Sequence, residues 1–321
     1  MPPSLARFER VALAMLAAWM GEHYYRTFRV LDDDTALDGT PFDALLTQRD
    51  RRAGVTIGTL WPDGEAVAVP GFETLVGGDI ADEGDSGGYV LWSPPGIAPP
   101  SEEPALSDFR LRIANGLKSL APNERREVRI PVTLQLAKTE AEGQYVSVTG
   151  GLSSHWTRIS EGVSGAFHLD SRTLHRLPEE EAELEILLSR VRDRAGLLNE
   201  GERSEVEVHD YWLVSRLPND QPLGLTMSGA RPDFDPLDGA TVRRQLRSNI
   251  KRAVEQGEAG QCDLAVLVLV GSVAHMEDEM ATTALKGMNP ALYASLDLIA
   301  LVADGRVRQV LQPRSLPWEA S

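Results

Sequence analysis

Cysteine is almost missing from this 321-residue chain, which contains only Cys262. One thiol cannot form a disulfide within the chain, and it cannot supply a zinc site built on several cysteines. Cys262 precedes the apolar run 264–270, so we interpret it as a small buried side chain. Low cysteine content suits the reducing cytosol, and we therefore expect a cytoplasmic protein.

Long apolar runs are also missing. The run at 11–20 has ten residues, whereas a membrane-spanning helix needs about 20. Glu9 interrupts the basic region that a signal peptide would need, so we expect neither a signal peptide nor membrane association. Phe8, Val11 and Met15 instead follow the spacing of an amphipathic helix. The pattern predicts a helix over 4–20, with Ser4 as its N-cap and Gly21 after its last turn.

Positive charge is scarce, because 32 Lys and Arg face 48 Asp and Glu, for a net charge of −16. Such a chain cannot bind nucleic acid over its whole surface, so any phosphate contact requires a local basic patch. One patch is evident on the helix predicted over 241–256, where cations recur at helical spacing. It consists of Arg243, Arg244, Arg247, Lys251 and Arg252. This face is a candidate for binding nucleic acid or an acidic partner protein, and its alternative interpretation is a solvated helix surface.

The apolar fraction of 42% and charged fraction of 25% are those of a globular protein. Helix and strand patterns alternate, which predicts a mixed α/β fold with a mixed sheet flanked by helices. The segment 93–104 contains five prolines and marks a stiff linker. We therefore expect an N-terminal α/β half-core over 1–92, a β-rich middle region over 105–176, and a C-terminal α/β region over 177–321.

Strand signals are clearest in the last third of the chain. The continuous apolar run 264–270 predicts a strand buried on both faces. The runs 298–303 and 306–311 flank Asp304-Gly305, a dipeptide typical of two-residue hairpin turns. Shorter strand-like runs cover 24–31, 42–47 and 54–61, directly after the first predicted helix.

The helix 4–20 with Glu9, the segment Pro41-Phe42-Asp43-Ala44-Leu45-Leu46 and the strand 53–61 together resemble the PD-(D/E)XK nuclease superfamily. The resemblance implies a restriction-endonuclease-like fold in which Asp43 is the family aspartate. In active members, two carboxylates hold Mg²⁺ and a lysine assists the attacking water. Thr56 and Gly58 stand where the family has Glu and Lys, so this copy of the motif lacks those groups.

Two other placements of the same outline fit the sequence. In the second, Asp210 in 209–214 is the aspartate, 223–229 is the next strand, and 241–256 with 264–270 complete the core; Thr226 and Ser228 replace Glu and Lys. In the third, the N-terminal half-core is completed by the C-terminal helix and strands, with 64–220 inserted between them.

The sequence therefore favours a role without catalysis. It indicates a degenerate nuclease-like accessory or scaffold subunit of a bacterial multi-protein system for nucleic-acid processing or defence, with other protein subunits as partners. No cofactor is expected. The first alternative is an active Mg²⁺-dependent nuclease with a displaced site, using Asp43 or Asp210 and a second carboxylate such as Glu9.

Three further motifs suggest other chemistry. Residues 84–88 read GDSGG, the nucleophile loop of trypsin-like proteases, which makes a serine hydrolase using Ser86 the second alternative. The acidic residues 79–85 in the same loop suggest a Ca²⁺ site or a solvated loop. Glu205, Glu207 and His209 alternate along one predicted strand and so project from one face, which suggests a metal site or an exposed strand face.

Overall fold

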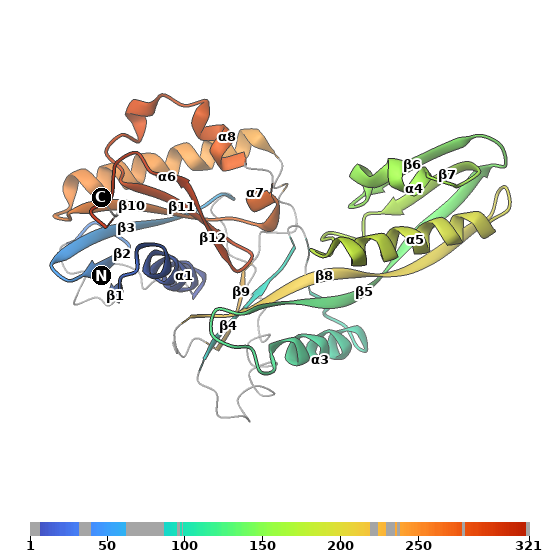
Figure 1. Ribbon diagram of the computed structural model, residues 1–321, viewed down its shortest axis with the longest axis horizontal. Helices are drawn as coiled ribbons and strands as arrows, with labels where there is room; N and C mark the ends of the chain where they lie inside the picture. Colours follow the sequence, from blue (N-terminus) through green and yellow to red (C-terminus); the bar gives the residue numbers. More distant parts are fainter. Residues whose placement is uncertain are drawn as a thin grey trace. The chain divides into compact units, whose positions relative to one another are not determined.

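A computed structural model of the chain (Figure 1) describes residues 7–31, 40–61, 87–94, 97, 99–218, 224–228, 235, 238–277 and 280–318. Over these residues the protein is mixed α/β, with two six-stranded sheets and flanking helices, as the sequence predicts. The chain forms two compact units. Unit 1 comprises Met1–Leu106, Leu117–Arg126 and Leu213–Ser321; unit 2 comprises Ser107–Gly116 and Glu127–Trp212.

The sheet of unit 1 has the order β1-β2-β3-β10-β11-β12. Its first three strands form an antiparallel meander, and β10 then lies parallel to both β3 and β11. The strands are β1 (Arg29–Leu31), β2 (Ala44–Gln48), β3 (Arg51–Thr59), β10 (Leu264–Val270), β11 (Leu298–Ala303) and β12 (Arg306–Leu311). The predicted strand 264–270 and the hairpin 298–311 are confirmed. Asp304 and Gly305 have φ values of 54° and 67°, the left-handed conformation that a type I′ hairpin turn requires.

Helices cover both faces of this sheet, which explains why its central strands are apolar throughout. The helix α1 (Arg7–Tyr24) lies on one face, and α6 (Gly239–Ala259) lies on the other (Figure 1). Alternate residues of β10 accordingly enter different cores: Val266 and Val268 pack with α1, whereas Leu267 and Leu269 pack with α6. This is the double burial that parallel strands show.

The two faces of β3 carry different kinds of side chain. Val55 and Ile57 enter the apolar core beneath α1. The intervening positions, Thr56 and Gly58, are buried and face α6, and they carry small side chains. Small residues there let α6 approach the sheet closely.

The helix α6 begins where Asp238 accepts a hydrogen bond of 3.0 Å from the backbone N–H of Ala240. Its buried stripe is made of Val242, Leu246, Ile250 and Ala253, as the sequence predicts. Three shorter elements follow β10 in unit 1: α7 (Val273–Glu277), α8 (Met280–Lys286) and the 3₁₀ turn Pro290–Leu292. Residues of α8 pack against α6 in the same apolar cluster.

The second sheet has the order β6-β7-β5-β8-β4-β9. Strands β4 (Gly88–Trp92) and β9 (Gly224–Ser228) belong to unit 1, whereas β6 (Gln144–Gly150) and β7 (Gly165–Ser171) belong to unit 2. The two long strands, β5 (Arg125–Glu140) and β8 (Arg203–Arg216), contribute residues to both units.

Unit 2 has its own apolar core. It lies between its strands and α5 (Glu181–Leu197), whose buried stripe contains Leu184, Leu187, Leu188 and Val191. A 3₁₀ turn at Ser153–His155 and α4 (Trp156–Ser160) add Ile159 to this core. The helix α3 (Ala105–Leu117) contributes Phe109, whose ring meets Trp212 edge-on at 5.0 Å between centroids. The sequence predicts no helix over 105–117, a segment that its patterns assign to a β-rich middle region.

The first helix differs from its prediction. Its predicted N-cap, Ser4, lies outside the described residues, and its last turn runs past Gly21 to Tyr24. Tyr25 adopts a φ of 52°, and the backbone N–H of Arg26 donates to the Gly21 carbonyl oxygen at 3.1 Å. The helix therefore ends in a left-handed residue that is not glycine, and the strand predicted over 24–31 is reduced to three residues.

Strands from the two ends of the chain meet in the sheet of unit 1. Strand β3 pairs in parallel with β10, from Ala53 with Leu264 to Thr59 with Val270. The N-terminal strands thus share one sheet with the C-terminal strands β10, β11 and β12, whereas β8 and β9 lie in the other sheet and are separated by β4.

Candidate functional site

Asp43 lies immediately before β2 and beside β3. Its backbone N–H donates to the Val55 carbonyl oxygen at 3.1 Å, and its carboxylate accepts the backbone N–H of Ile57 at 2.7 Å. The same carboxylate forms an ion pair with Arg252 of α6, with Nη1 at 3.2 Å from Oδ2. The side chains of Asp43 and Arg252 are 22% and 41% exposed, so the pair lies at the edge of the core.

Three residues of one face of α6 reach over this part of β3. Arg252 also donates to the Ile57 carbonyl oxygen, and Asn249 donates through Nδ2 to the Thr59 carbonyl oxygen at 2.8 Å. Gln256 accepts a hydrogen bond from the Thr56 hydroxyl. Asn249, Arg252 and Gln256 follow each other at helical spacing, so a single helix face engages Asp43 and the small-residue face of β3.

No space is left above Gly58. A methyl group at this position would overlap the carboxamide of Asn249. A lysine or glutamate in this register would displace Asn249 and break its bond to the strand. The small residues of β3 and the polar residues of α6 thus fit each other, and we call them the α6-covered site: Asp43, Thr56, Gly58, Asn249, Arg252 and Gln256.

These residues do not fit a divalent cation. Mg²⁺ is held by carboxylates and other oxygen ligands, and its charge repels nearby cations. The α6-covered site has one carboxylate, and its cation is the guanidinium of Arg252. Among the described residues, no group of three or more His, Cys, Asp or Glu side chains is placed to hold a metal ion.

Asp210, the other candidate aspartate, lies on β8 in unit 2 and is 1% exposed. One carboxylate oxygen accepts the backbone N–H groups of His175 and Arg176, at 2.9 and 2.8 Å. The other oxygen accepts the Trp212 indole N–H at 3.1 Å. Through these hydrogen bonds Asp210 holds the segment between β7 and α5 against β8. Its role here is structural.

The remaining candidates occupy separate places. Glu9 is half-buried on α1, which covers the sheet face opposite to α6 and Arg252. Glu205 and Glu207 are exposed on β8, and Glu205 accepts a hydrogen bond of 3.2 Å from Gln135. Ser86 and the acidic residues 79–85 lie outside the described residues.

The basic face of α6 is divided between two roles. Arg243, Arg244 and Arg247 are exposed, and Lys251 is exposed beside Glu255, with 3.6 Å between the charged atoms. Arg252 instead points to the strands and pairs with Asp43. The exposed cations available to a partner are therefore Arg243, Arg244, Arg247 and Lys251, which we call the α6 basic stripe.

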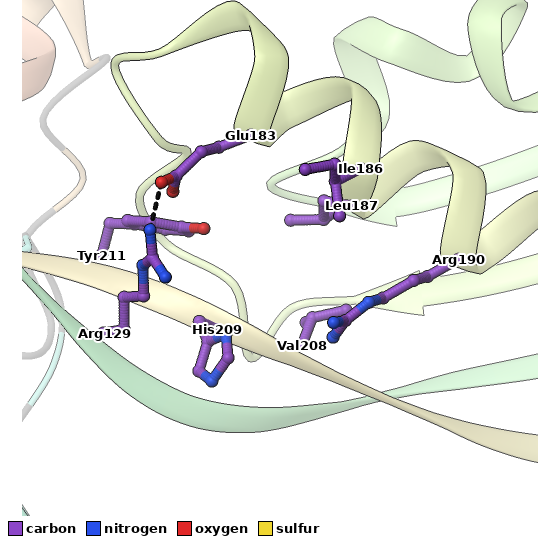
Figure 2. Close-up of a pocket in the computed structure, with 8 residues that line it drawn as sticks. All are labelled: Arg129, Glu183, Ile186, Leu187, Arg190, Val208, His209 and Tyr211. Carbon is purple, nitrogen blue, oxygen red and sulfur yellow. Dashed lines mark hydrogen bonds and ion pairs between the residues drawn. The ribbon is translucent and has the colours of Figure 1, made fainter.

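The structure also contains a pocket in unit 2 that the sequence patterns do not reveal. It lies between α5 and the strands β5 and β8 (Figure 2) and has a volume of about 210 Å³. Its walls are Arg129, Glu183, Ile186, Leu187, Arg190, Val208, His209 and Tyr211. Only the alternation of His209 with Glu207 points to it in the sequence, since the other residues come from elements far apart in the chain.

Burial and neighbouring charged groups shift the pKa values of two residues in this pocket, His209 and Tyr211. Burial, followed by the nearby Arg129 and Arg190, lowers the pKa of His209 below 6.5. Burial and a hydrogen bond to Glu183 raise the pKa of Tyr211 to about 12. At neutral pH the histidine is therefore uncharged and the tyrosine protonated, so both rings offer a hydrogen-bond donor.

The chain matches no family model, and comparisons with curated proteins and with solved structures found no match. The likeness to PD-(D/E)XK nucleases therefore stays a prediction from the sequence. None of the helices in the described part of the chain is long and apolar enough to span a bilayer.

Proposed function

We propose that this protein is a non-catalytic, nuclease-like accessory or scaffold subunit of a bacterial nucleic-acid-processing or defence system. The observation that carries the proposal is the ion pair of Arg252 with Asp43, the residue that matches the family aspartate. A guanidinium neutralises the carboxylate that an active enzyme would present to a metal ion.

The neighbouring positions support the same conclusion. Thr56 is 1% exposed and bonded to Gln256, so its hydroxyl cannot replace a metal-binding carboxylate. Gly58 is covered by Asn249, so the place of a catalytic lysine has neither an amine nor room for one. An active nuclease with a displaced site has less support, because Asp43 and Asp210 are each engaged by protein donors.

The α6 basic stripe is the surface by which such a subunit would meet its partner. Its four cations lie on the exposed side of α6, whereas Asn249, Arg252 and Gln256 hold the other side against β3. In a chain of net charge −16, a local cluster of arginines is suited to phosphates or to an acidic protein surface.

A plasmid-nicking assay with Mg²⁺ or Mn²⁺ tests the absence of catalysis. We expect no metal-dependent cleavage by the wild-type protein, by Asp43→Ala or by Arg252→Ala. The matched control is Asp50→Ala, which removes an exposed carboxylate from the turn between β2 and β3. Cleavage by the wild type and by the Asp50 variant, lost in the Asp43 variant, would overturn the proposal.

Fluorescence anisotropy with labelled oligonucleotides tests the partner. If nucleic acid binds the stripe, Arg243→Glu with Arg247→Glu should weaken binding, and each lost phosphate contact should reduce the salt slope by about 0.9. Arg26→Glu with Arg51→Glu, two exposed cations elsewhere in unit 1, is the matched control. If the wild type shows no salt-dependent binding, nucleic acid is not the partner of the stripe, and an acidic protein surface or a solvated helix face remains.

A further inference from the structure

The pocket of unit 2 combines an apolar wall with cationic groups. Ile186 and Leu187 of α5 and Val208 of β8 provide the aliphatic part, and the ring of Tyr211 closes one end. Arg190 extends from α5 toward Val208, and Arg129 reaches from β5 to Glu183; the His209 ring points away from α5 in this view (Figure 2). Ligand sites usually have this composition, in which a few polar groups are placed on a mostly apolar surface.

The charges in the pocket do not balance. Arg129 is paired with Glu183, and Glu183 also accepts the Tyr211 hydroxyl. Arg190 is exposed and makes no hydrogen bond or ion pair with any residue that the structure describes, whereas Arg112 of α3, near His209, is paired with Asp108 at 2.6 Å. The guanidinium of Arg190 therefore borders the pocket without a protein anion paired to it.

The volume limits the size of an occupant. An apolar cavity of about 150 Å³ holds one benzene ring, so a pocket of about 210 Å³ has room for one ring or branched chain and an anionic group. Arg190 is placed to bind the anionic group, and the aliphatic wall is placed to bind the apolar body of the ligand.

We propose that this pocket binds a small organic anion, either a carboxylate or a phosphate monoester, attached to an aromatic or branched aliphatic group. The proposal concerns unit 2 alone and does not depend on the α6-covered site of unit 1. The anion contacts the guanidinium of Arg190, with His209 in the lining of the same pocket, and its apolar part contacts Ile186, Leu187 and Val208.

Binding should change the protonation of His209. Arg129, Arg190 and Arg112 face this ring from three elements; Arg129 is paired with Glu183, and Arg112 is paired with Asp108. A bound anion offsets the arginines and therefore raises the pKa of His209. Affinity should consequently increase as the pH falls toward the ordinary histidine range.

The test is an NMR titration of the full chain in which the His209 imidazole resonances are followed. The probes are benzoate, phenyl phosphate and inorganic phosphate. Saturable shifts with benzoate support the carboxylate form, and saturable shifts with phenyl phosphate support the phosphate form. No saturable shift with either organic probe, or equal binding of inorganic phosphate, overturns the proposal.

Variants separate the two parts of the site. Arg190→Gln should weaken organic-anion binding about tenfold or more, because it removes a charge-assisted hydrogen bond. Ile186→Ser should weaken the organic probes alone, since this side chain supplies apolar surface and is 57% exposed. The matched control is Arg203→Gln, an exposed arginine on β8; an effect equal to that of Arg190→Gln would show non-specific binding and overturn the assignment.

Discussion

Asp43 and Asp210 are both aspartates beside strands, and both match the same sequence outline, yet the two units hold them differently. Asp43 is partly exposed and shares its carboxylate between one backbone N–H and an arginine far away in the chain. Asp210 is buried and accepts two backbone N–H groups and an indole N–H. The first is paired with a cation from α6, whereas the second gathers backbone and ring N–H donors and lies 3.4 Å from the His175 imidazole Nδ1.

This difference shows why a carboxylate on a strand is weak evidence for metal chemistry. A buried carboxylate is stable only when hydrogen bonds or opposite charges compensate its lost hydration. Both aspartates have this compensation from the protein itself. Catalytic use would require replacing Arg252 at Asp43 or breaking the backbone contacts at Asp210.

The largest predicted effect is a difference in the stability lost when each of the two aspartates is replaced by alanine. Asp210→Ala leaves three N–H donors without an acceptor; those of Arg176 and Trp212 are buried and cost about 1–3 kcal/mol each, so we expect a loss of about 3 kcal/mol or more. Asp43→Ala breaks a partly exposed ion pair and one backbone contact and should cost about 1–2 kcal/mol. Urea unfolding measures both, and hydrogen exchange at His175 and Arg176 reports the Asp210 effect locally. Equal losses would contradict the distinction.

A second experiment sharpens the description of the α6-covered site. Gly58→Ala places a methyl group against Asn249 and should cost about 1–3 kcal/mol, as overpacking does in a close-packed interior. Asn249→Ala removes the obstacle together with its bond to Thr59. In the double variant, the added cost of the Gly58 change should largely disappear, giving a clear coupling in a double-mutant cycle. Additive losses would mean that α6 does not cover Gly58 as described.

Much of the fold can be read from local pattern. The apolar run 264–270, the hairpin at Asp304-Gly305 and the stripe of α6 each carry the periodicity or turn chemistry of the element that forms. The end of α1 was mispredicted because Tyr25, and not Gly21, takes the left-handed conformation. The helix α3 was missed because its anchor, Phe109, acquires a partner only when Trp212 lies beside it.

The candidate site is harder to predict, because the role of Asp43 depends on contacts with residues far away in the chain. The sequence identifies Asp43 and the small residues Thr56 and Gly58, but Arg252 is 209 positions from Asp43 in the chain. The sequence places Arg252 in an exposed basic face, whereas the structure turns it toward β3. The pocket around Arg190 joins α5 with β5 and β8, so no contiguous motif marks it.

The smallest predicted effect concerns His209, whose environment is the reverse of that of Asp43: arginines surround a group that gains positive charge on protonation. Burial and these arginines lower its pKa below 6.5, so below that pH the unfolded chain binds the proton more readily than the folded one. The free energy of unfolding should therefore fall as the pH drops through 6.5. Because the ring is partly exposed, we expect well under about 1.4 kcal/mol per pH unit.

Urea unfolding above and below pH 6.5 measures this contribution as the difference between the wild type and His209→Gln. The glutamine variant should lose less stability on acidification, because its side chain takes up no proton. His168→Gln, a change at an exposed histidine of β7, is the matched control and should follow the wild type. If His209→Gln also follows the wild type, burial and the arginines do not lower the pKa of His209 as described.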